Sequence, residues 1–282
     1  MVLWGATMGV GSAQEVMAVL SSDVGPYREA LEGFRESLGQ TFSSVKLTEE
    51  SPKITPEVRV IVAFGGKAAQ LHYPDRIVLI YCLAPGTRLG IKDRRGLSIE
   101  VKMLPKATTI LSKLKEIQPD LKRLAVLWSS KSEEEEQQEM LKASPPLGIE
   151  IISERLNNAE ELPQHLRALY GKADGFFMLP DPILINARNL LLLKDFSWSN
   201  HIPFYVPTAG LVDQGAVASV SSSFREIGRV TGLAARNAVN GLPLQEIVYP
   251  EKVDITLNTK AAGNVGLQIP REIVQKADKV LP

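Results

Sequence analysis

Residues 58–70 read VRVIVAFGGKAAQ, and this stretch decides the fold. Val58–Phe64 is an apolar, β-branched run, which predicts a strand buried on both faces of a parallel sheet. Gly65-Gly66 then ends the strand and leads directly into a short helix that begins at Lys67. A buried strand that passes at once into a helix is the building unit of an α/β protein.

The same alternation of apolar runs and helical patterns continues along the chain. Gln118-Pro119-Asp120 ends a helix and divides the chain into two such halves. Ala18–Ser22 (AVLSS) in the first half is echoed by Ala125–Ser130 (AVLWSS) in the second, so the sequence predicts an α/β fold with two parallel-sheet lobes. The expected strands are residues 16–21, 45–47, 58–64, 77–82, 124–128, 149–153, 175–179, 203–206, 216–220 and 253–257, and the longer helices are residues 26–38, 104–117, 131–143, 162–170, 186–197 and 224–240.

The composition excludes several classes of protein. Of the 282 residues, 44% are hydrophobic and 23% are charged, as in an ordinary globular protein. Lys and Arg number 32, as do Asp and Glu, and the zero net charge argues against a nucleic-acid partner. One cysteine and three histidines argue against a disulfide framework or a zinc centre, so we expect no metal and no cofactor. No stretch approaches the roughly 20 apolar residues of a membrane span, so we expect no membrane insertion of the mature protein.

The N-terminus has a pattern of its own. Residues 2–13 (VLWGATMGVGSA) are uncharged, and Gly11-Ser12-Ala13 is similar to a signal-peptidase site just before Gln14. One interpretation is a signal-peptide remnant whose basic first part is missing from this chain, which would make the mature protein an exported one. The other is a disordered extension. In both cases residues 1–14 are expected to lie outside the folded lobes.

Ligands of open parallel sheets bind beyond the carboxyl ends of the strands. The residues that follow the expected strands are mostly small or hydroxyl-bearing, and two facing sheets would place them around a polar cleft. The candidate ligand-binding residues are Ser21, Ser22, Gly65, Gly66, Lys67, Cys82, Leu83 and Ala84 in the first half, and Ser129, Ser130, Asp181 and Thr208 in the second.

Two of these positions allow both a functional and a structural interpretation. Gly65-Gly66-Lys67 at a helix start presents backbone N–H groups that favour an anion such as a carboxylate, but a tight turn alone also needs glycine. Asp181 stands between two prolines, where it can cap the following helix or project into the cleft and accept from a ligand ammonium group. The family resemblance given below favours the second role for Asp181.

Other residues give no sign of catalysis. The acidic run Glu133–Glu136 is expected to be the solvated first turn of a helix. Trp128 is expected to pack in the core or to border the cleft. Cys82 is expected to be a small buried residue more than a nucleophile, because no histidine partner can be named for it. No acid–base pair or triad stands out, so we expect a binding protein and not an enzyme.

The C-terminal stretch Val253–Val280 reads VDITLNTKAAGNVGLQIPREIVQKADKV. It resembles the ABC-transporter substrate-binding proteins of the tryptophan/tyrosine-type group, which have a type I periplasmic-binding fold. Val60–Gln70 is similar to the family's strand with a small polar turn and Ala-Ala-Gln, and Phe177–Pro182 to its strand that ends in a ligand-facing Asp. Gly215–Gly228 is similar to its strand-to-helix crossover. The resemblance covers the chain after Gln14.

Three positions depart from the family's pattern. Gly66 stands where members that bind amino acids have Thr or Ser, and Leu83-Ala84-Pro85 replaces a Thr-Asp region. Ser223, a further candidate ligand-binding residue, replaces an expected acid. These departures are compatible with a ligand that carries fewer charges, or with a different anion.

The resemblance implies two Rossmann-like lobes joined by a multi-strand hinge, because the type I fold crosses between its lobes three times. We expect these crossings near Gln118, Ser221 and Pro250. The first lobe would then comprise residues 15–118 and 222–249, and the second residues 119–221 and 250–282.

The resemblance also implies a function. It suggests a monomeric, periplasmic or extracytoplasmic solute-binding protein that delivers a small polar ligand, such as an amino acid, to the membrane permease of an ABC-type importer. The alternative is a ligand sensor on the same fold that signals to a membrane receptor. A LacI-type regulator would need an N-terminal helix-turn-helix, for which the 15 residues before Val16 are too few.

Overall fold

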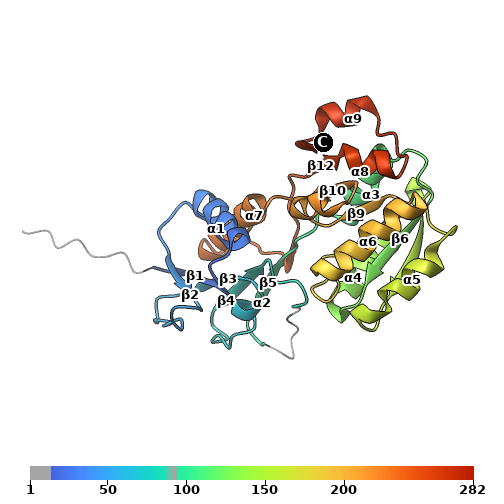
Figure 1. Ribbon diagram of the computed structural model, residues 1–282. Coiled ribbons are helices and arrows are strands. Elements are labelled where there is room, and N and C mark those ends of the chain that lie inside the picture. The colour runs from blue at the N-terminus through green and yellow to red at the C-terminus, as the bar shows by residue number, and fades with distance from the viewer. Residues whose placement is uncertain (1–13, 88, 90–93) are drawn as a thin grey trace, which may run out of the picture.

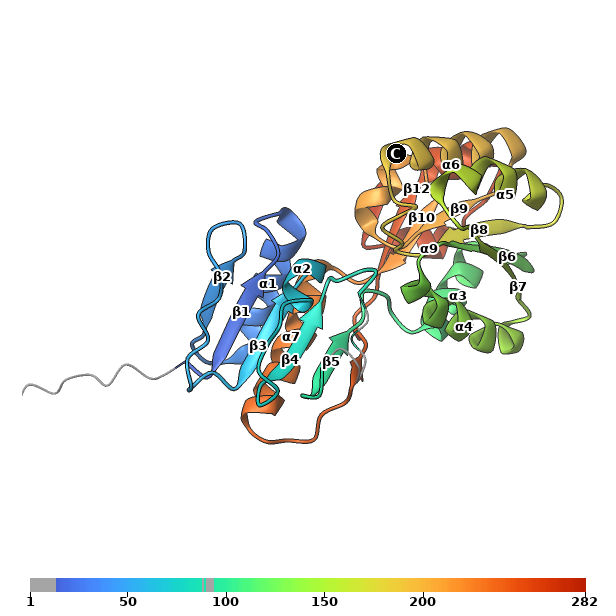
Figure 2. The same cartoon turned by 90° about the horizontal axis from the view of Figure 1, so that it is seen from below.

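The computed structural model describes residues 14–87, 89 and 94–282 (Figure 1). The chain forms two α/β lobes, each built on one sheet, with the connecting segments gathered between them (Figure 2). The predicted two-lobe α/β fold is confirmed. The predicted signal-peptide remnant or disordered extension covers residues 1–14, of which all but Gln14 lie outside the described residues.

The first lobe is built on a six-stranded sheet in which every neighbouring pair of strands is parallel. Its elements are β1 (Val16–Leu20), α1 (Gly25–Leu38), β2 (Ser43–Lys46), β3 (Val60–Phe64), α2 (Gly66–Ala69), β4 (Val78–Cys82), β5 (Ser98–Val101), α7 (Phe224–Val239) and β11 (Ile247–Val248). The strand order is β11-β5-β4-β3-β1-β2. Helices α1 and α7 pack on one face of the sheet and α2 packs on the other.

The strand that decides the fold, β3, lies in the interior of this sheet. Its five residues are all buried. Val62 and Phe64 pack in the core beneath α1 and α7, whereas Ile61 and Ala63 pack on the side of α2. Successive side chains of a strand point to opposite faces, so a sheet covered on both faces needs an unbroken apolar run in its inner strands.

The second lobe has a seven-stranded sheet in the order β13-β12-β10-β9-β8-β6-β7. Its strands are β6 (Arg123–Trp128), β7 (Glu150–Arg155), β8 (Gly175–Met178), β9 (Phe204–Val206), β10 (Ala218–Ser221), β12 (Asp254–Asn258) and β13 (Lys279–Leu281). Its helices are α3 (Ala107–Ile117), α4 (Glu134–Ala143), α5 (Leu162–Leu169), α6 (Ala187–Asn200), α8 (Thr259–Asn264) and α9 (Arg271–Lys276), with short 3-10 turns at η1 (Lys131–Glu133), η2 (Pro145–Leu147), η3 (Ala159–Glu161) and η4 (Ala209–Gln214). One apolar core lies beneath α3 and α4, and the other beneath α5 and α6.

One pair of neighbouring strands in this lobe, β10 and β12, is antiparallel, although the sequence predicts a parallel sheet. Strand β10 ends at Ser221, and the chain then forms α7 and β11 in the first lobe before it returns to form β12. The chain thus leaves and re-enters the second lobe at the same edge of the sheet. Strand β12 therefore runs in the direction opposite to β10.

The first crossing between the lobes lies before α3 and not after it. Leu111 and Leu114 of α3 are fully buried in the core of the second lobe, together with Leu124. The chain therefore crosses within residues 102–106, after β5, and not near Gln118 as the sequence predicts. The proline after Gln118 does end the helix, but the apolar face of that helix fits the second sheet, so the end of the helix is not the boundary of the lobe.

Helices α1 and α7 contact each other along their backbones. A side chain at Gly228 of α7 would overlap the carbonyl oxygen of Ala30 in α1. Across the same contact, Ser37 Oγ donates a hydrogen bond to the carbonyl oxygen of Arg229 at 2.7 Å. This close approach fixes α7 on the first lobe, although α7 follows a strand of the second lobe.

We expect Gly228→Ala to lower the free energy of unfolding by roughly 1–3 kcal/mol, because the added methyl group forces the two helices apart. The matched control is Gly263→Ala in α8, where no atom lies within 4 Å of the added methyl group. Alanine there should be neutral or slightly stabilising. Urea denaturation of both variants measures the difference, and equal stabilities would contradict the close helix contact.

Candidate functional site

Ser21 joins the end of β1 to helix α2 at the carboxyl edge of the first sheet. Its Oγ accepts a hydrogen bond from the backbone N–H of Ala68 at 2.9 Å. Gly65 lies beside it with φ of 94°, and a side chain there would lie 2.6 Å from Ser21 Oγ and would overlap the Tyr27 hydroxyl group. The turn therefore requires glycine for steric reasons. Ser21 and Gly65 thus lie next to each other, while their contact with a ligand stays a prediction.

A hydroxyl group that sequence reasoning missed lies beside Gly66. Thr87 is 8% exposed, and a Cβ atom at Gly66 would lie 2.9 Å from Thr87 Oγ1. The same Oγ1 accepts a hydrogen bond from Gln70 Nε2 at 3.1 Å. The Thr87 hydroxyl group, in the loop after β4, thus lies next to Gly66, which has no hydroxyl group of its own. The only sequence signal is that Thr87 is the hydroxyl residue of the segment LAPGT.

Cys82 and Leu83 lie in the core of the first lobe and not at its surface. Cys82 is 1% exposed and packs in the core that α7 covers, and burial raises the pKa of its thiol to about 12. Leu83 is 3% exposed, and its φ of 51° turns the chain after β4. These two side chains therefore stabilise the lobe, whereas Lys67 is exposed and Ala84 lines the pocket described below.

Asp181 is fully buried and joins two loops at the edge of the second sheet. Its Oδ2 accepts from the backbone N–H groups of Ser129 (2.7 Å) and Ser130 (2.6 Å). Its Oδ1 accepts from Ser130 Oγ (2.9 Å) and from the N–H of Ile183 (2.9 Å). Both carboxylate oxygens are thus occupied within the lobe, and α6 is capped by Asn186. The expected roles of Asp181 as helix cap or ligand-facing acid are therefore corrected: it holds the β6 and β8 loops together.

The remaining candidates differ in what their side chains do. Ser22 and Thr208 are half-buried, and within the described part of the chain neither hydroxyl group has a protein hydrogen-bond partner. Ser223 Oγ instead caps α7 by accepting from the N–H of Glu226 at 3.2 Å. Trp128 is 5% exposed and packs in the core of the second lobe. Within the described residues the hydroxyl groups of Ser22 and Thr208 are thus without a protein partner, as is the buried Oγ of Ser129.

The two lobes meet in a narrow pocket beside the connecting segments. Ala84 and Thr87 line it from the first lobe, and Glu133 lines it from the second. Its free volume is about 40 Å³, enough for only a few water molecules. Close to it, a Cβ atom at Gly86 would lie 3.3 Å from Cγ of Pro182, so the loops of the two lobes are in contact there.

The acidic run Glu133–Glu136 is only partly the solvated helix turn that the sequence predicts. Glu134–Glu136 form the first turn of α4 and Glu134 is exposed, but Glu133 is not solvated. Glu133 is only 4% exposed, and its Oε1 accepts from Ser132 Oγ at 3.3 Å. Burial, followed by the charges of Glu136 and Asp181, raises the pKa of Glu133 to about 7. Glu133 is thus buried at the pocket between the lobes, whereas Glu134, the next residue, is exposed.

Sequence similarity places the chain in a known family of proteins. A family model described as ABC transporter substrate binding protein matches residues 96–281, which is more than half of the chain. The chain belongs to this family. The substrate-binding protein is also 25% identical over 163 residues to an uncharacterized protein of Rickettsia prowazekii (strain Madrid E). That match spans 57% of the chain and 50% of the relative, so the chain covers about half of the relative's length.

Solved structures share the fold of this substrate-binding protein. The ABC domain from Streptococcus pneumonia in complex with L-Trp has a TM-score of 0.66 at 16% identity, with 94% of this chain and 100% of that chain covered. The ligand-free, open structure of a substrate binding protein with adhesive properties from Clostridium difficile has a TM-score of 0.69 at 14% identity, with 95% and 99% covered. Identities this low show the shared fold alone. Across residues 14–87, 89 and 94–282, none of the helices of the substrate-binding protein has the length and apolar character needed to span a membrane.

We expect Asp181→Asn to lower the free energy of unfolding of the substrate-binding protein by roughly 1.5–3 kcal/mol, the range for a hydrogen bond to a charged group. The amide nitrogen cannot accept from the N–H groups of the β6 loop. Asp195→Asn, on an exposed side chain of α6, is the matched control and should have little effect. Chemical denaturation measures both variants. Unchanged stability of Asp181→Asn would show that the buried hydrogen bonds do not hold the loops.

We expect Glu133→Gln to change how stability depends on pH. The folded-state pKa of about 7 lies above the ordinary value of 4.5, so between these pH values the folded protein binds more protons than the unfolded chain. Stability of the wild type should therefore fall as pH rises through this window. Glu133→Gln should remove this loss and be more stable at pH 8, by roughly 3 kcal/mol for a shift from 4.5 to about 7 at about 1.4 kcal/mol per pKa unit.

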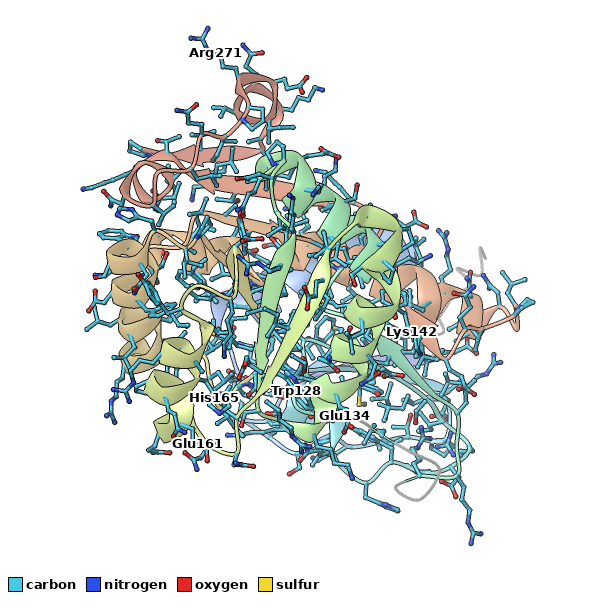
Figure 3. The ribbon with its side chains drawn as sticks, turned by 90° about the vertical axis from the view of Figure 1, so that its right-hand side faces the viewer. Trp128, Glu134, Lys142, Glu161, His165 and Arg271 are labelled. Atoms are coloured by element: carbon cyan, nitrogen blue, oxygen red, sulfur yellow. The ribbon has the colours of Figure 1, made fainter. Side chains whose placement is uncertain are left out.

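Denaturation at pH 4.5 and pH 8 tests this expectation, and the two proteins should be close in stability at the lower pH. The matched control is Glu134→Gln, on the exposed side chain next along the chain (Figure 3). Parallel pH profiles of the wild type and Glu133→Gln would contradict the raised pKa.

Proposed function

We propose that this protein is the extracytoplasmic solute-binding component of an ABC-type importer, and that it captures a small polar ligand between its lobes. The observation that carries the proposal is that the chain belongs to the substrate-binding family and that the three connections between its lobes within the described residues all begin at the carboxyl end of a strand. The two ligand-binding edges therefore face the same interlobe space. Its partner would be the membrane permease, and it would act as a monomer.

The chemistry of the two edges favours a ligand bound mainly by neutral groups. Ser22 and Thr208 offer hydroxyl groups for which the described residues provide no protein partner, and the first N–H groups of α2 at Gly66 and Lys67 are not used by the helix itself. Asp181, in contrast, is saturated by protein donors. An amino acid or a related small molecule fits such a set, and the similar fold from Streptococcus pneumonia was solved with L-Trp.

Binding would couple to movement of the lobes. A ligand that contacts both edges stabilises the arrangement in which the edges lie close together, and shifts the protein toward that state. The connecting segments are short, so the lobes would move as rigid bodies about them. The closed arrangement would present surfaces of both lobes together, which the permease can recognise. No bond of the ligand is changed in this scheme.

The ligand can be identified directly from the purified protein. Native mass spectrometry of protein purified without refolding detects a co-purified small molecule by its mass, and isothermal titration with the identified compound gives the affinity. We expect one ligand per chain. If no small molecule co-purifies and no compound in an amino-acid and small-metabolite screen raises the thermal midpoint, the proposal is contradicted.

We expect Ser22→Ala and Thr208→Ala each to weaken binding of that ligand by roughly three- to tenfold, the loss of one neutral hydrogen bond of about 1 kcal/mol. Neither change should alter the thermal midpoint of the free protein, because neither hydroxyl group has a protein partner within the described residues. Ser44→Ala, on the exposed side of β2, is the control. Titration calorimetry measures all three. Wild-type affinity in both cleft variants would place the ligand elsewhere.

A further inference from the structure

The segments that connect the lobes are tied to one another by hydrogen bonds. The backbone N–H of Lys102, in the first crossing, donates to the carbonyl oxygen of Val248 at 2.9 Å, just before the third crossing. Ser222 Oγ, in the second crossing, donates to the carbonyl oxygen of Lys252 in the third at 2.6 Å. The three crossings therefore form one unit, and a side chain on this unit is well placed to control the angle between the lobes.

The side chain of Lys102 lies at this point and contacts both lobes. Its Nζ is 3.1 Å from Oε1 of Glu100, which belongs to β5 of the first lobe. It is also 2.8 Å from Oε1 of Glu136 and 3.4 Å from Oε2 of Glu135, which belong to α4 of the second lobe. The Lys102 side chain is only 4% exposed, so water screens these interactions weakly.

A second contact joins the same helix to the connecting segments. The Tyr249 hydroxyl group, next to β11, donates to Oε1 of Glu139 in α4 at 2.6 Å. Figure 3 shows α4 between its labelled residues Glu134 and Lys142. The first half of α4 is thus held to the hinge by an ion cluster and by a phenolic hydrogen bond. Helix α4 is in turn packed on the second sheet through Met140, so it moves with that lobe.

We propose that Lys102 is an interlobe clasp: its ammonium group neutralises carboxylates from both lobes and so holds the lobes at one angle. The charges explain why the lysine is needed. Glu100 on one lobe and Glu135 and Glu136 on the other are all acidic, and without the cation between them they repel one another. Removal of the lysine charge therefore turns an attraction between the lobes into a repulsion.

If the protein binds a ligand between its lobes, as proposed, the Lys102 clasp also affects the affinity for that ligand. A group that favours one interlobe angle changes the population of the state that binds ligand, and thereby the apparent affinity, without touching the ligand. Lys102 would then be a positioning residue. The clasp itself can be tested on the free protein, so its failure and a failure of the proposed function are distinguishable.

The test measures the distance between the lobes by double electron–electron resonance. Spin labels are placed at Arg236→Cys in α7 and Leu191→Cys in α6, both on exposed positions of helices in different lobes. The native Cys82 is buried with a raised thiol pKa, so it should react slowly with the label. In this background, Lys102→Met keeps the aliphatic stem and removes the charge. We expect its distance distribution to broaden and shift relative to the wild type.

Three comparisons make the result specific. Lys113→Met removes a lysine that is paired with Glu116 inside α3, and it should leave the distribution unchanged. Adding Glu135→Gln and Glu136→Gln to Lys102→Met removes the repulsion and should move the mean distance back toward that of the wild type. The same two glutamine changes with Lys102 intact should broaden the distribution, which keeps the test available if Lys102→Met does not fold.

The proposal is overturned if the distributions of Lys102→Met and of the two-glutamine variant superimpose on that of the wild type. It is also overturned if Lys113→Met produces an equal change, because the effect would then not belong to the interlobe cluster. A shift in Lys102→Met that the added glutamines do not reduce would contradict the repulsion on which the clasp depends.

Discussion

The carboxyl ends of three strands carry every connection between the lobes that the described chain contains. Strands β5, β10 and β11 each end at a crossing, so both sheets must turn their carboxyl edges toward the connecting segments. The loops with the most variable chemistry in a parallel sheet lie at that edge. Both carboxyl edges therefore face one interlobe space.

The buried charged groups at these edges are paired with other groups of the protein. Asp181 is surrounded by donors of its own lobe, and Lys102 by carboxylates of both. Burying a charge is costly unless it is paired or hydrogen-bonded. Once a charge is satisfied in this way, it is not available to a ligand. The hydroxyl groups of Ser22 and Thr208, in contrast, have no protein partner within the described residues.

The two helices next to the crossings show how packing assigns a segment to a lobe. Helix α3 follows β5 of the first lobe yet buries its apolar face in the second, and α7 follows β10 of the second lobe yet packs on α1 of the first. In each case the order of elements along the chain suggests that the helix belongs to the lobe it follows, but its apolar face packs on the other lobe. For α7 the contact includes a close backbone approach at Gly228, where a side chain would overlap the carbonyl oxygen of Ala30.

The sequence by itself determined the elements that depend on local pattern. The apolar run of β3 and the alternation of buried strands with helix faces sufficed for two α/β lobes, because both leave a local pattern in the chain. The resemblance of the C-terminal stretch indicated the family. Only the tertiary structure decided the lobe to which α3 belongs, the buried role of Asp181, the pairing of Thr87 with Gly66 and the partners of Lys102. Each of these depends on contacts between segments far apart in sequence, and burial and charge pairing are properties of those contacts and not of the local pattern.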